Sequence, residues 1–139
     1  MQQVLVYSDS LSWGIVPTTR RRQPFEARWP GVMEMALSQQ HYGVRVIEDC
    51  LNGRRTVWIG IPRGPIAAKF TGAAEKSQGL ADAYRAIAAE TQCHFFDSGS
   101  VTQASAVDGI HLDAEQHQAL GQALARCVAG LPGVLTRTA

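Results

Sequence analysis

The amino-acid sequence predicts an α/β fold built around a short, mostly parallel sheet. Two runs rich in β-branched residues, 3–7 (QVLVY) and 44–48 (VRVIE), have the composition of buried strands, and a helical pattern lies between them. Strands that are joined through a helix pair in parallel with a right-handed crossover. The 139 residues are enough for one such domain, which we place at 1–139.

The first half of the chain is expected to form one strand-loop-helix-strand unit. Residues 15–28 are predicted to be irregular, because they hold Pro17, Pro24 and the arginine run at 20–22. A helix is expected over residues 30–40, since a proline in the first helical turn lacks only an N–H that would be unpaired there. Its apolar residues have the i, i+3, i+4 spacing of a buried stripe: Val32, Met33, Ala36 and Leu37.

The second half is expected to contain two further strands and two helices. Residues 56–61 (TVWIGI) and 93–96 (CHFF) have strand composition. A helix covering the sheet is predicted over 73–91, from an apolar stripe formed by Leu80, Tyr84 and Ile87. A last helix is predicted over 114–129, where Asp113 can cap the first turn and Gln116 can complete a capping box.

Composition excludes several classes of protein. The 13 basic and 12 acidic residues leave a net charge of +1, which does not indicate nucleic-acid binding, and residues 20–22 (RRR) are better explained as a solvated loop than as an anion site. Three cysteines without C-x-x-C spacing indicate neither a disulfide framework nor a zinc site. No apolar run is long enough for a leader or a membrane span, so we expect a cytoplasmic protein with no membrane partner. No cofactor is indicated.

The first predicted strand ends in a polar, glycine-bearing stretch, YSDSLSWG, over residues 7–14. Ligands of open parallel sheets bind beyond the carboxyl ends of the strands, so Ser10 is expected at the functional edge of the sheet. A serine hydroxyl reacts only when a base activates it. Ser10 is therefore a candidate nucleophile that requires a histidine and a carboxylate from elsewhere in the chain.

His111 and Asp108 are the candidates for those two groups. They lie in VDGIHLD, a turn before the last predicted helix, and Asp108 can fold back to accept an imidazole N–H. A solvated histidine in an ordinary turn is the alternative. A metal site made by Asp108, His111 and Asp113 is disfavoured, because Asp113 is better explained as a helix cap. Gly53, after the second strand, could offer its backbone N–H to a ligand, or could be an ordinary turn glycine.

YSDSLSWG and VDGIHLD together resemble the SGNH/GDSL hydrolase family, whose first block carries the nucleophile in G-D-S-L and whose last block carries a D-x-x-H pair. The chain is most similar to the bacterial arylesterase and acyltransferase branch, through Trp13-Gly14, RWPGVM and CHFFDSGSV. The likeness covers about the first 58 and the last 70 residues.

The resemblance implies a flavodoxin-like three-layer sandwich and gives each site residue a role. Ser10 would be the nucleophile, His111 the general base and Asp108 its orienting partner, with the backbone N–H groups of Ser10 and Gly53 in the oxyanion hole. Trp13 and Trp58 are candidate walls for a small ester substrate, with core packing as their alternative. The branch often assembles, so we expect a homo-oligomer.

The sequence departs from the family pattern at two places. Ser8 stands where the family has a glycine, and a serine would be strained there if the position requires a positive φ. The central G-x-N-D block is not found: Asn52 is the only asparagine, and the 44 residues between Asp49 and His94 are too few for the lost units, since one β-α-β unit takes about 30 or more. The fold is therefore expected to lack its central strand. Either residues 56–61 or a second chain would take the place of that strand, or the sequence is a shortened version of a longer product.

Two functions follow from these observations. The first is a serine esterase or acyltransferase that hydrolyses small carboxylic esters through an acyl-serine intermediate. The second is a catalytically impaired or inactive protein of the same fold that acts as a binding or assembly module. The missing asparagine, which would donate to the oxyanion, favours the second.

Overall fold

Two parallel strands form the sheet in the computed structural model, which describes residues 1–19, 21–50, 75 and 77–138. Strand β1 (Gln2–Ser8) pairs with β2 (Val44–Cys50) in a register that runs from Gln2 opposite Val44 to Ser8 opposite Cys50. The predicted α/β class with a short parallel sheet is confirmed, and both strands are longer than the apolar runs that predicted them.

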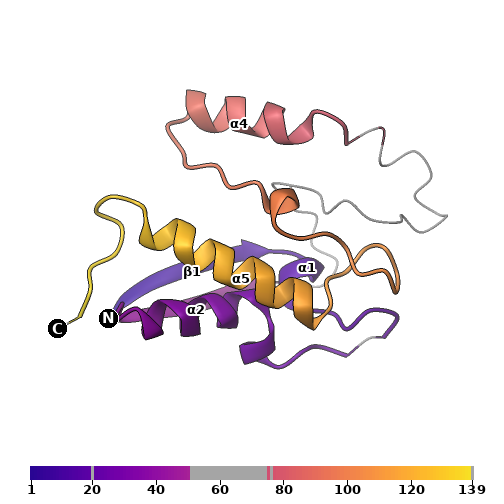
Figure 1. Ribbon diagram of the computed structural model, residues 1–139, viewed down its shortest axis with the longest axis horizontal. Helices are drawn as coiled ribbons and strands as arrows, with labels where there is room; N and C mark the ends of the chain where they lie inside the picture. Colours follow the sequence, from indigo (N-terminus) through magenta and orange to yellow (C-terminus); the bar gives the residue numbers. More distant parts are fainter. Residues whose placement is uncertain (20, 51–74, 76, 139) are drawn as a thin grey trace.

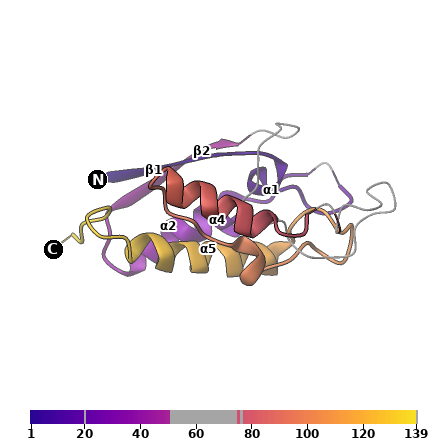
Figure 2. The same ribbon diagram turned by 90° about the horizontal axis from the view of Figure 1, so that it is seen from above.

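Helices α2 (Trp29–Gln39) and α5 (Ala114–Ala129) pack against one face of this sheet (Figures 1 and 2). Pro30 lies in the first turn of α2, as predicted. The buried core between the sheet and the two helices is mostly aliphatic and includes Val6, Met33, Leu37, Val46 and Leu120. The two termini lie at one end of the molecule, and α1 (Ser10–Trp13) lies at the other (Figure 1).

Helix α5 matches its predicted bounds and its predicted start. The Asp113 side chain accepts from the backbone N–H of Gln116, and the Gln116 side chain accepts from the N–H of Asp113, so the capping box is complete. Gly121 allows α5 to lie close to α2, since a Cβ there would come within 2.6 Å of the Trp29 carbonyl oxygen and of Val32 Cβ. Any larger residue would push the two helices apart.

His117, one turn into α5, is fully buried at the contact between α5 and α2. Its Nδ1 accepts the backbone N–H of Trp29 at 3.3 Å. Burial, helped by the nearby Arg28 and opposed by Asp113, lowers the pKa of His117 to about 4. The imidazole is therefore neutral at pH 7 and serves as an acceptor for the otherwise unpaired start of α2.

Residues 93–96, predicted as a strand, do not form one: they have no regular secondary structure and pair with no strand of the described sheet. Strand composition makes an extended backbone favourable, but a strand needs a neighbour for its backbone groups, and the two-stranded sheet of the described residues does not reach them. The predicted strand 56–61 lies outside the described residues.

Part of the helix predicted over 73–91, at residues 73, 74 and 76, lies outside the described residues, and α4 forms the later part from Leu80 to Glu90. It starts after Gly79, whose φ of 74° ends any earlier helical run, and it buries none of its residues. Leu80 and Tyr84 are half-buried and Ile87 is exposed. The prediction of a helix that covers the sheet was therefore wrong, because α4 buries no apolar face.

The face of the sheet opposite α2 and α5 carries the exposed apolar side chains Leu5, Tyr7 and Ile47. Two short 3-10 turns, η1 (Phe25–Ala27) and η3 (Ser98–Ser100), complete the described elements. Among the residues that the structure describes, no helix has the length and apolar character needed to cross a membrane.

Candidate active site

Ser10 is the first residue of α1, a single helical turn that begins as soon as β1 ends. Asp9 caps this turn through its side chain, which accepts the Leu11 backbone N–H at 3.0 Å. Gly14 ends it with a φ of 79°, a conformation that favours glycine. The helical turn is thus held at both ends, by the Asp9 side-chain cap and by the left-handed Gly14.

The Ser8 substitution does not strain the backbone. Ser8 is the last residue of β1 and is not among the residues with positive φ. Its hydroxyl accepts from the Ser12 hydroxyl at 2.8 Å, and Ser12 in turn accepts from the Trp29 indole N–H at 3.0 Å. This buried chain of hydrogen bonds ties β1, α1 and α2 together beneath Ser10.

Asp108 and His111 are in contact, as the spacing of VDGIHLD predicted. His111 Nδ1 lies 2.8 Å from Asp108 Oδ2, while the other carboxylate oxygen accepts the backbone N–H groups of Ile110 and His111 at 2.9 Å. This leaves Nε2 as the outward-facing nitrogen of the imidazole. The pair is held on both sides of the carboxylate, so its orientation is well defined.

The pKa of Asp108 is lowered from its usual value. Burial opposes this shift and is the largest single contribution, but the hydrogen bonds from the His111 side chain and from the backbone of His111 and Ile110 together outweigh it. Asp108 is therefore ionised at pH 7. An ionised carboxylate at Nδ1 is the arrangement that keeps a proton on Nδ1 and leaves Nε2 free to accept one.

Helix α1, which begins with Ser10, and the loop before α5, which holds Asp108 and His111, lie at the same end of the molecule (Figure 1). The backbone N–H of Thr18, in the loop that follows α1, donates to Asp108 Oδ2 at 3.4 Å. Within the described residues, however, no hydrogen bond joins Ser10 to His111. The structure brings two of the three predicted residues into contact and the third to the same edge.

Two arginines and a glutamate, which sequence reasoning did not select, surround the end of α1. Arg22 Nε and Arg28 Nη1 both donate to the carbonyl oxygen of Trp13, at 2.8 and 3.4 Å. Both guanidinium groups also pair with Glu48 Oε2, at 3.0 and 2.9 Å. The sequence did hold an indication of this for Glu48. Residues 44, 46 and 48 alternate along the strand and share one face, so Glu48 lies on the same buried face as Val44 and Val46.

Arg22 belongs to the arginine run whose predicted role was a solvated loop. Its guanidinium lies 4.9 Å from the centre of the Trp13 ring and is already paired with Glu48. It is therefore engaged within the protein, although the residue itself is exposed in a loop, as predicted.

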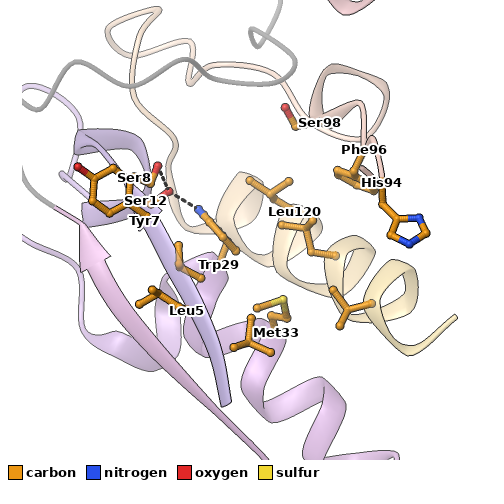
Figure 3. Close-up of a pocket in the computed structure, with 14 residues that line it drawn as sticks. Leu5, Tyr7, Ser8, Ser12, Trp29, Met33, His94, Phe96, Ser98 and Leu120 are labelled. Atoms are coloured by element: carbon orange, nitrogen blue, oxygen red, sulfur yellow. Dashed lines mark hydrogen bonds between the residues drawn. The ribbon is translucent and has the colours of Figure 1, made fainter. Parts of the chain in front are cut away.

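An apolar cavity of about 370 Å³ runs along β1 (Figure 3). Residues 4–8 of β1 form one wall, Leu120, Leu124 and Val128 of α5 form another, and the cavity is also lined by His94, Phe96 and Ser98. Trp13, a predicted substrate wall, is half-buried against the core and does not line this cavity.

Gly53 and Trp58, the other predicted binding residues, lie outside the described residues. Among the residues that are described, no group of three or more His, Cys, Asp or Glu side chains could hold a metal ion. All three cysteines are free: Cys50 is buried, with its pKa raised to about 11 mainly by burial, while Cys93 is exposed.

No protein-family model matches the chain, and no curated protein matches it in sequence. Its fold, in contrast, is similar to that of several esterases of known structure. A putative arylesterase from Agrobacterium tumefaciens str. C58 is 27% identical, with a TM-score of 0.79 over 93% of this chain and 99% of that one.

Two further structures share the fold at lower identity. Est24, a carbohydrate acetylesterase from Sinorhizobium meliloti, has a TM-score of 0.82 at 23% identity, over 93% of this chain and 99% of that one. The M. smegmatis aryl esterase has a TM-score of 0.83 at 22% identity, over 94% of this chain and 100% of that one. The α/β fold of this chain is thus one that esterases use.

Proposed function

We propose that this chain is a serine esterase or acyltransferase of the SGNH/GDSL type, which acts on small carboxylic esters through an acyl-Ser10 intermediate. The observation that carries the proposal is the Asp108–His111 pair, 2.8 Å apart, in a loop that lies at the same end of the molecule as α1, which begins with Ser10 (Figure 1). The likeness to esterase structures supports the same reaction class.

In the proposed mechanism, His111 Nε2 takes the proton of the Ser10 hydroxyl as its oxygen attacks the ester carbonyl carbon. Asp108, ionised and hydrogen-bonded to Nδ1, stabilises the imidazolium that forms. The alcohol leaves with the proton from His111, and an acyl group remains on Ser10. Water, or a second alcohol in the transferase case, then gives a proton to His111 and attacks the acyl carbon. Ser10 is released and takes that proton back from His111.

The oxyanion of this reaction would be held by the backbone N–H groups of Ser10 and Gly53. Loss of one oxyanion donor typically lowers kcat by about 100- to 1,000-fold. If the central asparagine block is missing, as the sequence indicates, we therefore expect an enzyme that is slower than a complete member of the family but not inert.

The test is covalent labelling of Ser10 by a fluorophosphonate, together with hydrolysis of p-nitrophenyl acetate. We expect wild-type protein to form one adduct at Ser10, and Ser10→Ala and His111→Ala to lose both labelling and hydrolysis. Ser38→Ala, which alters an exposed serine of α2, is the matched control and keeps both. A wild-type chain that forms no adduct at Ser10 contradicts the proposal.

The second candidate function is an impaired or inactive protein that serves as a binding or assembly module. It is favoured by the lack of a hydrogen bond between Ser10 and His111 in the described part of the chain. It predicts that hydrolysis by the wild type does not exceed that by Ser10→Ala, and a rate that depends on Ser10 would rule it out.

We also propose that the chain forms a homo-oligomer, because Leu5, Tyr7 and Ile47 leave an apolar sheet face exposed. Sedimentation equilibrium tests this: Leu5→Lys is expected to shift the protein toward monomer, and a monomeric wild type would contradict it.

A further inference from the structure

Arg28 and Glu48 occupy positions that local sequence rules disfavour. Arg28 is the N-cap of α2, where a small polar residue is preferred, and its side chain makes no capping hydrogen bond. Its positive charge also lies at the positive end of the helix dipole. Glu48 lies on the buried face of β2, where the strand otherwise places Val44, Val46 and Cys50. Something other than local structure must account for both residues.

The two side chains form a buried ion pair. Arg28 Nη2 lies 2.9 Å from Glu48 Oε2, and the two side chains are only 6% and 9% exposed. The pair is also incompletely satisfied, since Arg28 Nε and Glu48 Oε1 are buried without a hydrogen-bond partner. Burying charges with unpaired polar atoms is costly, and such a pair is poor evidence for a purely stabilising role.

Burial shifts both groups toward their neutral forms. It is the largest cause of the lowered pKa of Arg28 and of the raised pKa of Glu48, and the attraction between them only partly offsets it. An apolar pair of similar size would avoid this desolvation. The charges are therefore best explained by what they contact.

That contact is the end of α1. Arg28 Nη1 donates to the carbonyl oxygen of Trp13, the last residue of the helical turn that Ser10 begins, and Arg22 Nε donates to the same oxygen. The stem of Arg28 passes directly under Gly14, where an added Cβ would lie 2.5 Å from Arg28 Cδ. Glu48 binds both guanidinium groups and so fixes α1 to β2.

We propose that Arg28 and Glu48 form a positioning pair for the nucleophile: through the carbonyl of Trp13 they hold α1, and with it Ser10, against the sheet. This inference rests on the proposed function, because it assigns the pair to the Ser10 site. Neither residue touches the reacting atoms. Displacement of a reactive group by about 1 Å can cost about 100-fold in rate, which is the kind of loss that such a pair would prevent.

The test compares Arg28→Met and Glu48→Gln with wild type in three measurements. The first is the rate of fluorophosphonate labelling at Ser10, the second is the separate kcat and KM for p-nitrophenyl acetate, and the third is hydrogen exchange of the α1 amides. We expect labelling and kcat to fall by about 10- to 100-fold with KM nearly unchanged, and exchange at Trp13 and Gly14 to speed up.

Arg28→Lys adds a test of geometry, since an ammonium keeps the charge but lacks the planar fork that reaches both Glu48 and the Trp13 carbonyl. It is expected to recover the melting temperature but not the labelling rate. If Arg28→Met does not fold, Arg22→Met takes its place, because Arg22 is partly exposed. This substitution removes one hydrogen-bond donor to the Trp13 carbonyl and leaves the Arg28–Glu48 pair intact.

Arg45→Met is the matched control. Arg45 lies on the same strand and pairs with Glu34 at 3.8 Å on the exposed side, so all three measurements should stay at wild-type values. Folded variants that label at the wild-type rate with unchanged α1 exchange overturn the inference. A wild type that does not label contradicts the proposed function instead, and α1 exchange then still decides whether the pair holds the helix.

Discussion

Helices α5 and α4 have similar amphipathic patterns in the sequence, yet they are attached to the protein in opposite ways. Helix α5 begins with a complete capping box and buries five residues, among them His117, Leu120 and Gly121. Helix α4 begins after a glycine in the left-handed conformation, has no side-chain cap and buries none. One is part of the core and the other lies on its surface.

The difference shows what a periodic pattern does and does not predict. Apolar residues at helical spacing predict that a helix forms, because they offer one face for burial. Whether that face is buried depends on a partner element, and α5 has α2 packed beside it (Figure 2). Helix α5 also follows directly on the turn that holds His111, so its stability and the geometry of the candidate site are linked.

The largest effect is expected from a substitution in the loop that joins the candidate site to α5. Asp108→Asn should lower esterase activity by about 10⁴-fold, because an amide no longer holds His111 in the tautomer that leaves Nε2 free. Steady-state hydrolysis of p-nitrophenyl acetate measures it. Asp113→Asn is the matched control, since asparagine also caps helices, and it should retain activity. Equal activity in the two variants would show that Asp108 has no catalytic role.

Truncation of one apolar side chain on each helix tests the difference in burial directly. Leu120→Ala should lower the free energy of unfolding by about 2–5 kcal/mol, because Leu120 is fully buried. Ile87→Ala on α4 should change it by less than about 0.5 kcal/mol, because Ile87 is 52% exposed. Urea denaturation measures both, and similar losses would mean that α4 is buried in solution.

The buried His117 makes the stability of the α5–α2 contact dependent on pH. Its pKa is about 4 in the folded protein and about 6.5 in an unfolded chain, so the unfolded state takes up the proton first. The stabilisation by neutral His117 is therefore complete above about pH 6.5 and is lost as the pH falls toward 4. Between pH 7 and pH 4.5 the loss should be about 2–3 kcal/mol.

His117→Gln tests the assignment, since glutamine can accept the Trp29 N–H but does not titrate in this range. Urea denaturation at the two pH values should show a smaller difference for the variant than for wild type. The same pH dependence in both proteins would assign the effect to other groups.

The smallest expected effect concerns the close approach of α5 to α2. Gly121→Ala should lower the free energy of unfolding by about 1–3 kcal/mol, because its Cβ would overlap the Trp29 carbonyl. Gly130→Ala is the control: its Cβ would lie 3.4 Å from the nearest atoms, and it should be close to neutral. A neutral Gly121→Ala would mean that the two helices can separate without cost.

Much of the candidate site could be predicted because it depends on short-range chemistry. Asp108 and His111 are three residues apart around a turn, so their contact follows from local geometry. Asp113 and Gln116 form their capping box for the same reason. Ser10 was placed at the end of a strand by the polar residues that follow an apolar run, and α1 begins there.

The contacts that could not be predicted join residues far apart in the sequence. Nothing local indicates that Arg28 would leave the N-cap of α2 without a side-chain hydrogen bond and reach Trp13 and Glu48 instead. Residues 93–96 have strand composition, but a strand exists only where a neighbouring backbone completes its hydrogen bonds. The same holds for α4, whose pattern does not specify a partner.

By itself, the sequence determined the α/β class, the parallel β1–β2 unit, both core helices and the Asp108–His111 pair, because propensity, capping and turn chemistry act over a few residues. Only the tertiary structure decided that α4 stays on the surface, that His117 is neutral in the core and that a buried arginine and glutamate hold α1. These depend on which groups lose water and which partners they meet, and a linear pattern carries neither kind of information.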